Sequence, residues 1–134
     1  MEWFRLSRWR YSTCRSDTPR AHDVQPQGVL VLANDADAHD ADLQGITTVV
    51  LHFPKYTDGR AFSQAQMLRR RGFTGTVRAT GDVLVDQLLQ MQRCGFSEAV
   101  LRQDQNLQVA QRLLQAFSGF YQADAQEKKP LFAR

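Results

Sequence analysis

The sequence predicts an α/β fold, with about four parallel strands alternating with three helices. Short apolar runs are separated by segments with helical periodicity, and this spacing is longer than the tight turns that join antiparallel strands. A Gly-Phe pair also precedes two of the predicted strands, at residues 72–73 and 95–96, and this weak repeat fits consecutive βα units. Such strands can form a small open sheet or a sheet resembling half of a βα barrel, and both architectures remain open.

Each predicted strand is a short apolar run bounded by polar or glycine-containing segments. Continuous apolar character, rather than strict alternation, is typical of strands in parallel sheets, and the second run is also rich in β-branched residues. The predicted strands are residues 28–33, 46–53, 75–80 and 98–102.

Helices are predicted after the second, third and fourth strands, at residues 59–71, 83–93 and 107–121. Asp58 or Thr57 can cap the first helix and Asp82 the second, because a side-chain oxygen at that position accepts a free backbone N–H. Gly72 and Gly95 are natural helix ends.

The 134 residues are enough for one hydrophobic core, and a single α/β domain is expected over residues 28–121. Residues 1–27 are expected to be an irregular basic arm. Residues 122–134 are a polar tail closed by Leu131 and Phe132, which suggest docking onto the body or onto a partner, although fraying is the more common fate of such a tail. The N-terminus lacks the apolar core of a secretory signal and no apolar run could span a membrane, so a cytoplasmic protein is expected.

The formal net charge of +3 resides in the N-terminal arm. Residues 1–20 hold five arginines against Glu2 and Asp17, whereas the remaining residues are electrically balanced. A nucleic-acid-binding domain needs a basic face on its folded body. We therefore expect neither a nucleic acid nor a membrane as the partner.

Polar residues follow the second predicted strand, at the edge where parallel α/β proteins build binding sites. An oxyanion near Gly59 would gain from the positive end of the helix dipole, with Lys55 as a point charge and Arg60 as a bidentate fork. Sulfite, sulfate, phosphate or a carboxylate would suit such a site. The alternative is that Asp58 caps the helix while Lys55 and Arg60 are solvated.

Arg78 lies inside the third predicted strand and therefore needs a carboxylate partner, because an unpaired buried charge is costly. Asp82, Asp86 and Asp58 are the candidates. An ion pair that fixes neighbouring loops is the structural interpretation. The functional hypothesis is that Arg78 converges with Lys55 and Arg60 on one electropositive mouth.

Cofactor and metal motifs are missing from the sequence, so no cofactor and no metal are expected. There is no G-x-G-x-x-G, no G-x-x-x-x-G-K-[ST] and no C-x-x-C. The acidic stretch at residues 35–42 lacks the glycine and the glutamate of a calcium loop. Cys94 is predicted at the C-terminal end of a helix, where the dipole disfavours a thiolate, so a buried structural thiol is expected.

Three segments carry a family resemblance: F-P-K-Y-T-D-G-R-A-F-S-Q at residues 53–64, G-F-T-G-T-V-R-A-T-G-D-V-L-V-D-Q-L at residues 72–88, and R-C-G-F at residues 93–96. They resemble a bacterial family catalogued as domain of unknown function 934, and the resemblance runs from about Gly28 to Tyr121. Val85 and Thr80 depart from the family pattern, beside the matched positions. Genes of this family often lie beside those for assimilatory sulfite reductase, and some members carry an oxidoreductase label tied to sulfite reduction.

The resemblance implies an accessory or partner protein of assimilatory sulfite reduction, which binds the reductase, its electron donor or a small oxyanion at the carboxyl edge of the strands. The alternative is a small enzyme acting on an anionic substrate at a cavity around Lys55, Arg60 and Arg78, with Lys55 or Asp58 in acid–base work. An enclosed pocket around Lys55 would favour the enzyme, whereas an exposed apolar patch would favour the partner protein. The candidate binding residues are Lys55, Asp58, Arg60, Gln64, Arg78 and Asp82, and no catalytic residue is identified.

Overall fold

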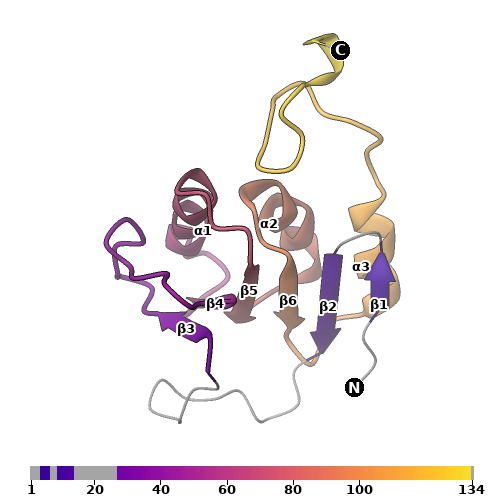
Figure 1. Ribbon diagram of the computed structural model, residues 1–134. Helices are drawn as coiled ribbons and strands as arrows, with labels where there is room; N and C mark the ends of the chain where they lie inside the picture. Colours follow the sequence, from indigo (N-terminus) through magenta and orange to yellow (C-terminus); the bar gives the residue numbers. More distant parts are fainter. Residues whose placement is uncertain (1–3, 7–8, 14–26, 134) are drawn as a thin grey trace.

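The computed structural model describes residues 4–6, 9–13 and 27–133, which form one six-stranded sheet with helices packed against it (Figure 1). The strands are β1 Phe4–Leu6, β2 Trp9–Thr13, β3 Val29–Leu32, β4 Thr48–Phe53, β5 Thr76–Gly81 and β6 Glu98–Leu101. The α-helices are α1 Arg60–Arg70, α2 Leu88–Cys94 and α3 Leu107–Leu114, and the short 3-10 helices are η1 Val85–Gln87 and η2 Leu131–Ala133.

The four predicted strands are confirmed as parallel neighbours in the order β6-β5-β4-β3. Their register places Val49 of β4 beside Val77 of β5 and Ala79 of β5 beside Ala99 of β6. Because β3 and β1 are the two edges of the sheet, the sheet is open. The longest described helix has 11 residues, and none is long and apolar enough to cross a bilayer.

Two further strands lie in the N-terminal arm, which the sequence predicted to be irregular. β2 pairs parallel with β6, and β1 pairs antiparallel with β2. These strands are only three and five residues long and carry arginines, so they lack the apolar run that identifies a strand. Pairing with β6, far along the chain, places them in the sheet. Residues 14–26 lie outside the described part of the chain.

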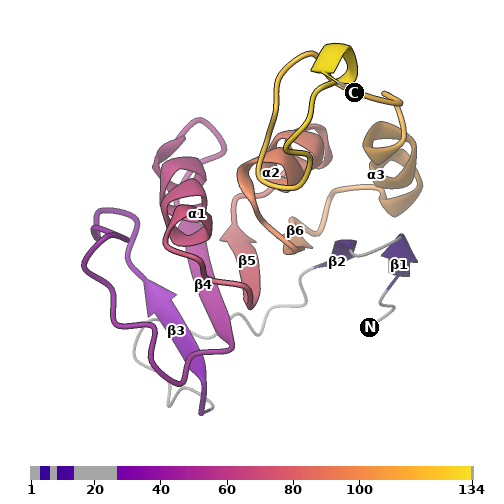
Figure 2. The same ribbon diagram turned by 45° about the horizontal axis from the view of Figure 1, so that its top comes forward.

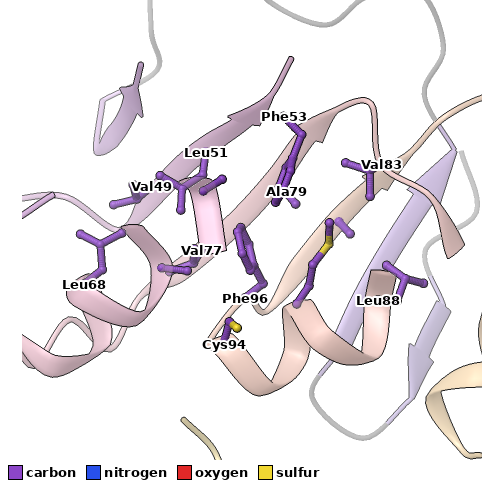
Figure 3. Packing of buried hydrophobic residues seen from close by; sticks show 14 of the residues in the cluster. Val49, Leu51, Phe53, Leu68, Val77, Ala79, Val83, Leu88, Cys94 and Phe96 are labelled. Atoms are coloured by element: carbon purple, nitrogen blue, oxygen red, sulfur yellow. The ribbon is translucent and has the colours of Figure 1, made fainter. Parts of the chain in front are cut away.

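The hydrophobic core lies between one face of the sheet and the helices, which all pack on that face (Figure 2). In β4, Val49, Leu51 and Phe53 are fully buried, while the residues between them are partly or fully exposed. These residues belong to one continuous cluster of buried side chains that also includes residues of α1 and α2 (Figure 3). Burying each large side chain contributes roughly 1.5–3 kcal/mol, so this layer holds the sheet and the helices together.

Three phenylalanines from different elements meet at the centre of this core. The ring of Phe53 lies 5.2 Å from that of Phe62 and 5.8 Å from that of Phe96, measured between centroids. The first of these contacts is edge-to-face, the geometry that the aromatic quadrupole favours. Since Phe53 is the last residue of β4, the cluster fixes the point from which the next loop leaves the sheet.

The second and third helices are shorter than predicted. The segment after β5 forms η1 before α2 begins at Leu88, and Asp82 does not cap the helix because its carboxylate bonds elsewhere. α3 ends at Leu114. The prediction of Gly95 as a helix end is confirmed, since it caps α2 in the left-handed region with φ +109°.

Residues 115–130 contain no regular element, and together with η2 they are called the C-terminal segment (residues 115–133) below. Arg93 of α2 attaches this segment to the body. Its guanidinium forms an ion pair of 3.1 Å with Asp124 and lies 4.0 Å from the ring centroid of Phe120. Its backbone carbonyl accepts a hydrogen bond of 3.0 Å from the Ala125 N–H.

Candidate functional site at the carboxyl edge

Polar side chains follow β3, β4, β5 and β6 and meet at the carboxyl edge of the sheet. Parallel strands place the residues that follow them at the same edge, which is why binding sites in α/β proteins collect there. These residues are called the carboxyl-edge cluster below: Asn34, Asp58, Arg60, Asp82, Arg102 and Asp104.

Asp58 organises the loop between β4 and α1. Its carboxylate accepts bonds of 3.2 and 2.8 Å from the Arg60 guanidinium, a bidentate pair, and one of 3.1 Å from the Arg60 backbone N–H. The Asn34 amide, from the loop after β3, adds a bond of 2.9 Å. The hydrogen bonds and charge of Arg60 lower the pKa of Asp58 from 3.8 to about 2. Although Gly59 occupies the N-cap position, Asp58 still satisfies the first backbone N–H of α1.

Asp82 links the loops after β4, β5 and β6. One carboxylate oxygen accepts the Tyr56 N–H at 2.8 Å, and the other accepts Arg102 Nη1 at 2.8 Å. Arg102 also holds Asp104 in a bidentate pair, with bonds of 2.7 and 2.6 Å. The Tyr56 N–H is the main cause that lowers the pKa of Asp82, and Arg102 lowers the pKa of Asp104. All three carboxylates are therefore held in their ionised form.

Gly81 allows the loop after β5 to pass close to β4. Its φ is +95°, and a Cβ built there would lie 2.3 Å from the backbone oxygen of Phe53. This oxygen accepts the next backbone N–H, that of Asp82, at 2.8 Å. Because only glycine fits this backbone and this space, Gly81 sets the position from which Asp82 reaches Tyr56 and Arg102.

The other two predicted residues of this edge differ in their surroundings. The side chain of Lys55 is exposed and has no hydrogen-bond or ion-pair partner among the described residues, whereas its backbone oxygen accepts the Asp58 N–H at 2.9 Å. Gln64 of α1 is only 6% exposed, and its Nε2 donates to the carbonyls of Ala33 and Ala36, both at 2.8 Å. Gln64 thus fastens the loop after β3 to the first helix.

Two buried amide oxygens lie in this part of the edge. Since carbonyl oxygens only accept, the bonds from Gln64 Nε2 fix the orientation of its amide, and Asp58 fixes that of Asn34 in the same way. Gln64 Oε1 and Asn34 Oδ1 are left without a partner in the described part of the chain. Unpaired acceptors suit a hydrogen-bond donor and disfavour an oxyanion.

Arg78 does not join Lys55 and Arg60. Its neighbours in β5, Val77 and Ala79, are fully buried under the helices, so Arg78 points to the opposite face of the sheet. There its Nε donates to the Glu98 carboxylate at 2.7 Å, and the register places Glu98 directly opposite it in β6. The predicted partners Asp82, Asp86 and Asp58 are wrong, and so is the shared mouth with Arg78.

Asn34, Arg102 and Asp104 were missed from the sequence. The rule that identified Lys55 and Asp82, a polar residue directly after a strand, applies equally to Asn34 after β3 and to Arg102 after β6. The prediction had restricted this rule to two of the four strands. The partner Glu98 was also within reach, because it is the one carboxylate in the predicted strand 98–102.

Cavities and metal-ligand sets lie elsewhere or are not found. Two cavities stand out on the described part of the chain, and Lys55, Arg60 and Arg78 line neither of them. Within the same residues, no group of three or more His, Cys, Asp and Glu side chains is arranged to hold a metal ion. Cys94 is buried as predicted, and desolvation raises the pKa of its thiol.

Comparison with known proteins agrees with the resemblance seen in the sequence. No curated protein and no solved structure matches the chain. The model of a bacterial family described as protein of unknown function (DUF934) matches residues 28–132, which include all of β3 to α3 and nearly all of the C-terminal segment. The chain therefore belongs to the DUF934 family of bacterial proteins.

Proposed function

We propose that the protein is an accessory or partner protein of assimilatory sulfite reduction, and that it contacts the sulfite reductase or its electron donor through the C-terminal segment. The pathway comes from the family resemblance. The contact surface is inferred from a set of exposed aromatic side chains on that segment.

Three large aromatic residues of the C-terminal segment are exposed: Phe117 by 63%, Tyr121 by 81% and Phe132 by 75%. Aromatic residues such as these are among the types that contribute most to protein interfaces. They are presented by a segment that Arg93 and Phe120 fasten to α2 (Figure 2). A partner would therefore meet a surface whose backbone is already held in place, which lowers the entropy cost of binding.

The carboxyl edge supports this role better than the enzyme alternative. A general base at neutral pH works best with a pKa near the operating pH, whereas that of Asp58 lies at about 2. The Arg60 fork is occupied by Asp58, so an oxyanion at this edge would compete with a carboxylate for it. The contacts at the carboxyl edge therefore favour a structural role for its loops over a catalytic one.

A growth experiment tests the pathway. A deletion strain should fail to grow with sulfate as the sole sulfur source but should grow with cysteine, and the wild-type gene should restore growth on sulfate. Normal growth of the deletion strain on sulfate, in a bacterium without a second copy of the gene, would rule out the pathway.

Complementation with variants tests the surface. The triple variant Phe117→Ser, Tyr121→Ser, Phe132→Ser should fail to restore growth while accumulating as a folded protein, because the lost aromatic area is mostly exposed and only the Phe117 ring packs on another ring, that of Phe120. Tyr56→Ser is the matched control, since Tyr56 is 51% exposed but lies at the carboxyl edge. It should restore growth.

Arg60→Lys separates the two classes of function. Lysine keeps the charge but loses the bidentate fork to Asp58. A partner role on the C-terminal segment predicts that this variant restores growth. If Arg60→Lys fails while the triple aromatic variant succeeds, the functional surface is the carboxyl edge and the proposal is wrong. Direct titration of purified sulfite reductase with the same variants gives the binding constants.

A further inference from the structure

A second site lies at the other end of the helices, where a cavity of ≈ 440 Å³ opens between α1, α2 and the C-terminal segment. The last turns of the two helices supply two walls, and the C-terminal segment supplies the third. The side chains that matter for its chemistry are Gln66, Arg70, Gln90, Arg93, Asp124 and Lys128. This volume is in the range of small-molecule sites and exceeds that of a single inorganic ion.

The walls of this cavity carry more positive than negative charge. Four cations line it, and Asp124 is the one carboxylate among the lining residues. Arg69 is committed to the carbonyls of Phe73, Gly75 and Gly95, and Arg93 to Asp124. Arg70 and Lys128 have no partner among the described residues. The uncommitted charge of the cavity is therefore positive.

The helix walls of the cavity add hydrogen-bond donors that lack a strong acceptor. The side-chain amides of Gln66 and Gln90 come from two different helices, and each donates to the same atom, Cys94 Sγ, at 3.5 Å. Sulfur of a thiol is a weak acceptor. The side-chain amides of Gln66 and Gln90 would form stronger hydrogen bonds with a ligand oxygen that accepts from both of them.

Cations near helix C-termini have an ordinary explanation, because they complement the helix dipole. This explanation accounts for Arg70 in the last turn of α1 and for Arg93 in that of α2. It does not account for Lys128, which lies on no helix, or for the two amide donors. The lining as a whole is rich in donors and poor in acceptors.

We propose that this cavity binds a small multivalent anion through oxygens that only accept hydrogen bonds, either carboxylate or phosphate oxygens. Arg70 and Lys128 contact the anion with their charges, and Gln66 and Gln90 donate to it from the walls formed by α1 and α2. The C-terminal segment forms one wall of the cavity, but Phe117, Tyr121 and Phe132 do not line it.

Calorimetric titration of the full chain with citrate and, separately, with pyrophosphate at low ionic strength tests the proposal and distinguishes the two oxygen chemistries. Saturable binding of at least one probe is expected. Arg70→Gln and Lys128→Gln should each weaken it about tenfold or more, the size of one charge-assisted hydrogen bond. Gln66→Leu should weaken it with no change in net charge, which a purely electrostatic attraction would not explain.

Two matched variants control for charge. Arg112→Gln removes one exposed cation from α3, and Lys55→Gln removes one from the carboxyl edge, so each should change the affinity less than twofold. The proposal is overturned if neither probe binds saturably, or if Lys55→Gln or Arg112→Gln weakens binding as much as Arg70→Gln. Unchanged thermal midpoints would establish that all the variants are folded.

Discussion

The two ends of the sheet use their charged side chains in opposite ways. At the carboxyl edge, Asp58, Asp82 and Asp104 are each hydrogen-bonded to an arginine, and the arginine that binds Asp82 comes from a neighbouring loop. At the amino edge, where α1 and α2 end, the cavity beside the C-terminal segment has cations without partners among the described residues. Ligand sites in parallel sheets usually lie at the carboxyl edge. Here the charges of that edge pair with one another except for Lys55, and the cavity with uncommitted charge lies at the other end.

The carboxyl edge of this sheet, where binding sites usually form, therefore has a structural role. Four loops that would otherwise move independently are joined through Asn34, Asp58, Asp82 and Arg102. Joined loops give a fixed edge, whereas the cavity at the amino edge is walled by a segment without regular structure. We therefore expect substitutions at the carboxyl edge to affect stability and those at the amino edge to affect binding.

The largest effect is expected at the carboxyl edge, for Gly81→Ala. A left-handed backbone costs a non-glycine residue about 1–2 kcal/mol, and forcing an extra carbon into occupied space costs a further 1–3 kcal/mol or so. The free energy of unfolding should therefore fall by about 3 kcal/mol in urea denaturation. Gly45→Ala is the control, since Gly45 has φ +72° but no atom within 4 Å of the position that a Cβ would take. Equal losses in the two variants would contradict the close approach of Gly81 to Phe53.

An intermediate effect is expected from acid. Because the pKa of Asp58 is about 2 in the folded protein and 3.8 ordinarily, its ion pair stabilises the fold fully above the ordinary value. That contribution is lost as the pH falls from about 4 towards 2. The urea midpoint should drop over this range, and Asp58→Asn should flatten the drop. Asp86→Asn, an exposed change outside the carboxyl-edge cluster, should leave it as steep as in the wild type.

The smallest effect on stability is expected at the amino edge, for Arg93→Lys. Lysine keeps the charge near Asp124 but loses the planar contact with Phe120, so global stability should change by about 1 kcal/mol or less. Chymotrypsin should nevertheless cut the C-terminal segment several times faster than in the wild type. Arg112→Lys on α3 should not change the rate. An unchanged cleavage rate in Arg93→Lys would mean that other contacts hold the segment.

Much of the fold could be predicted because its signals are local. Apolar runs indicated β3 to β6, and Gly95 marked the end of α2. β1 and β2 could not be found in this way, since their pairing partner β6 lies far along the chain and their own residues form no apolar run. The late start of α2 also results from contacts between residues that are distant in the sequence. Asp82 could have capped a helix, but Tyr56 and Arg102, from two other loops, bind its carboxylate.

In the candidate site, too, the positions of residues could be predicted from local signals, whereas their contacts could not. Placing Lys55, Asp58 and Arg60 after β4 needed only the strand boundary. The contacts of those residues depend on loops that meet only after folding, so the Asn34–Asp58 bond could not be predicted. The Arg78–Glu98 pair is an exception, because alternation along neighbouring strands would have directed attention to Glu98.

The strand order also constrains when each part of the chain can fold. β3, β4, β5 and β6 follow one another in sequence and lie side by side, so each can join the sheet soon after it is synthesised. β2 is made before all of them, yet its neighbour in the sheet is β6, which is made last. During synthesis, β1 and β2 cannot pair with the rest of the sheet until β6 has emerged from the ribosome. We therefore expect this pair of strands to be the last element to join during folding and the first to detach when the protein is stressed.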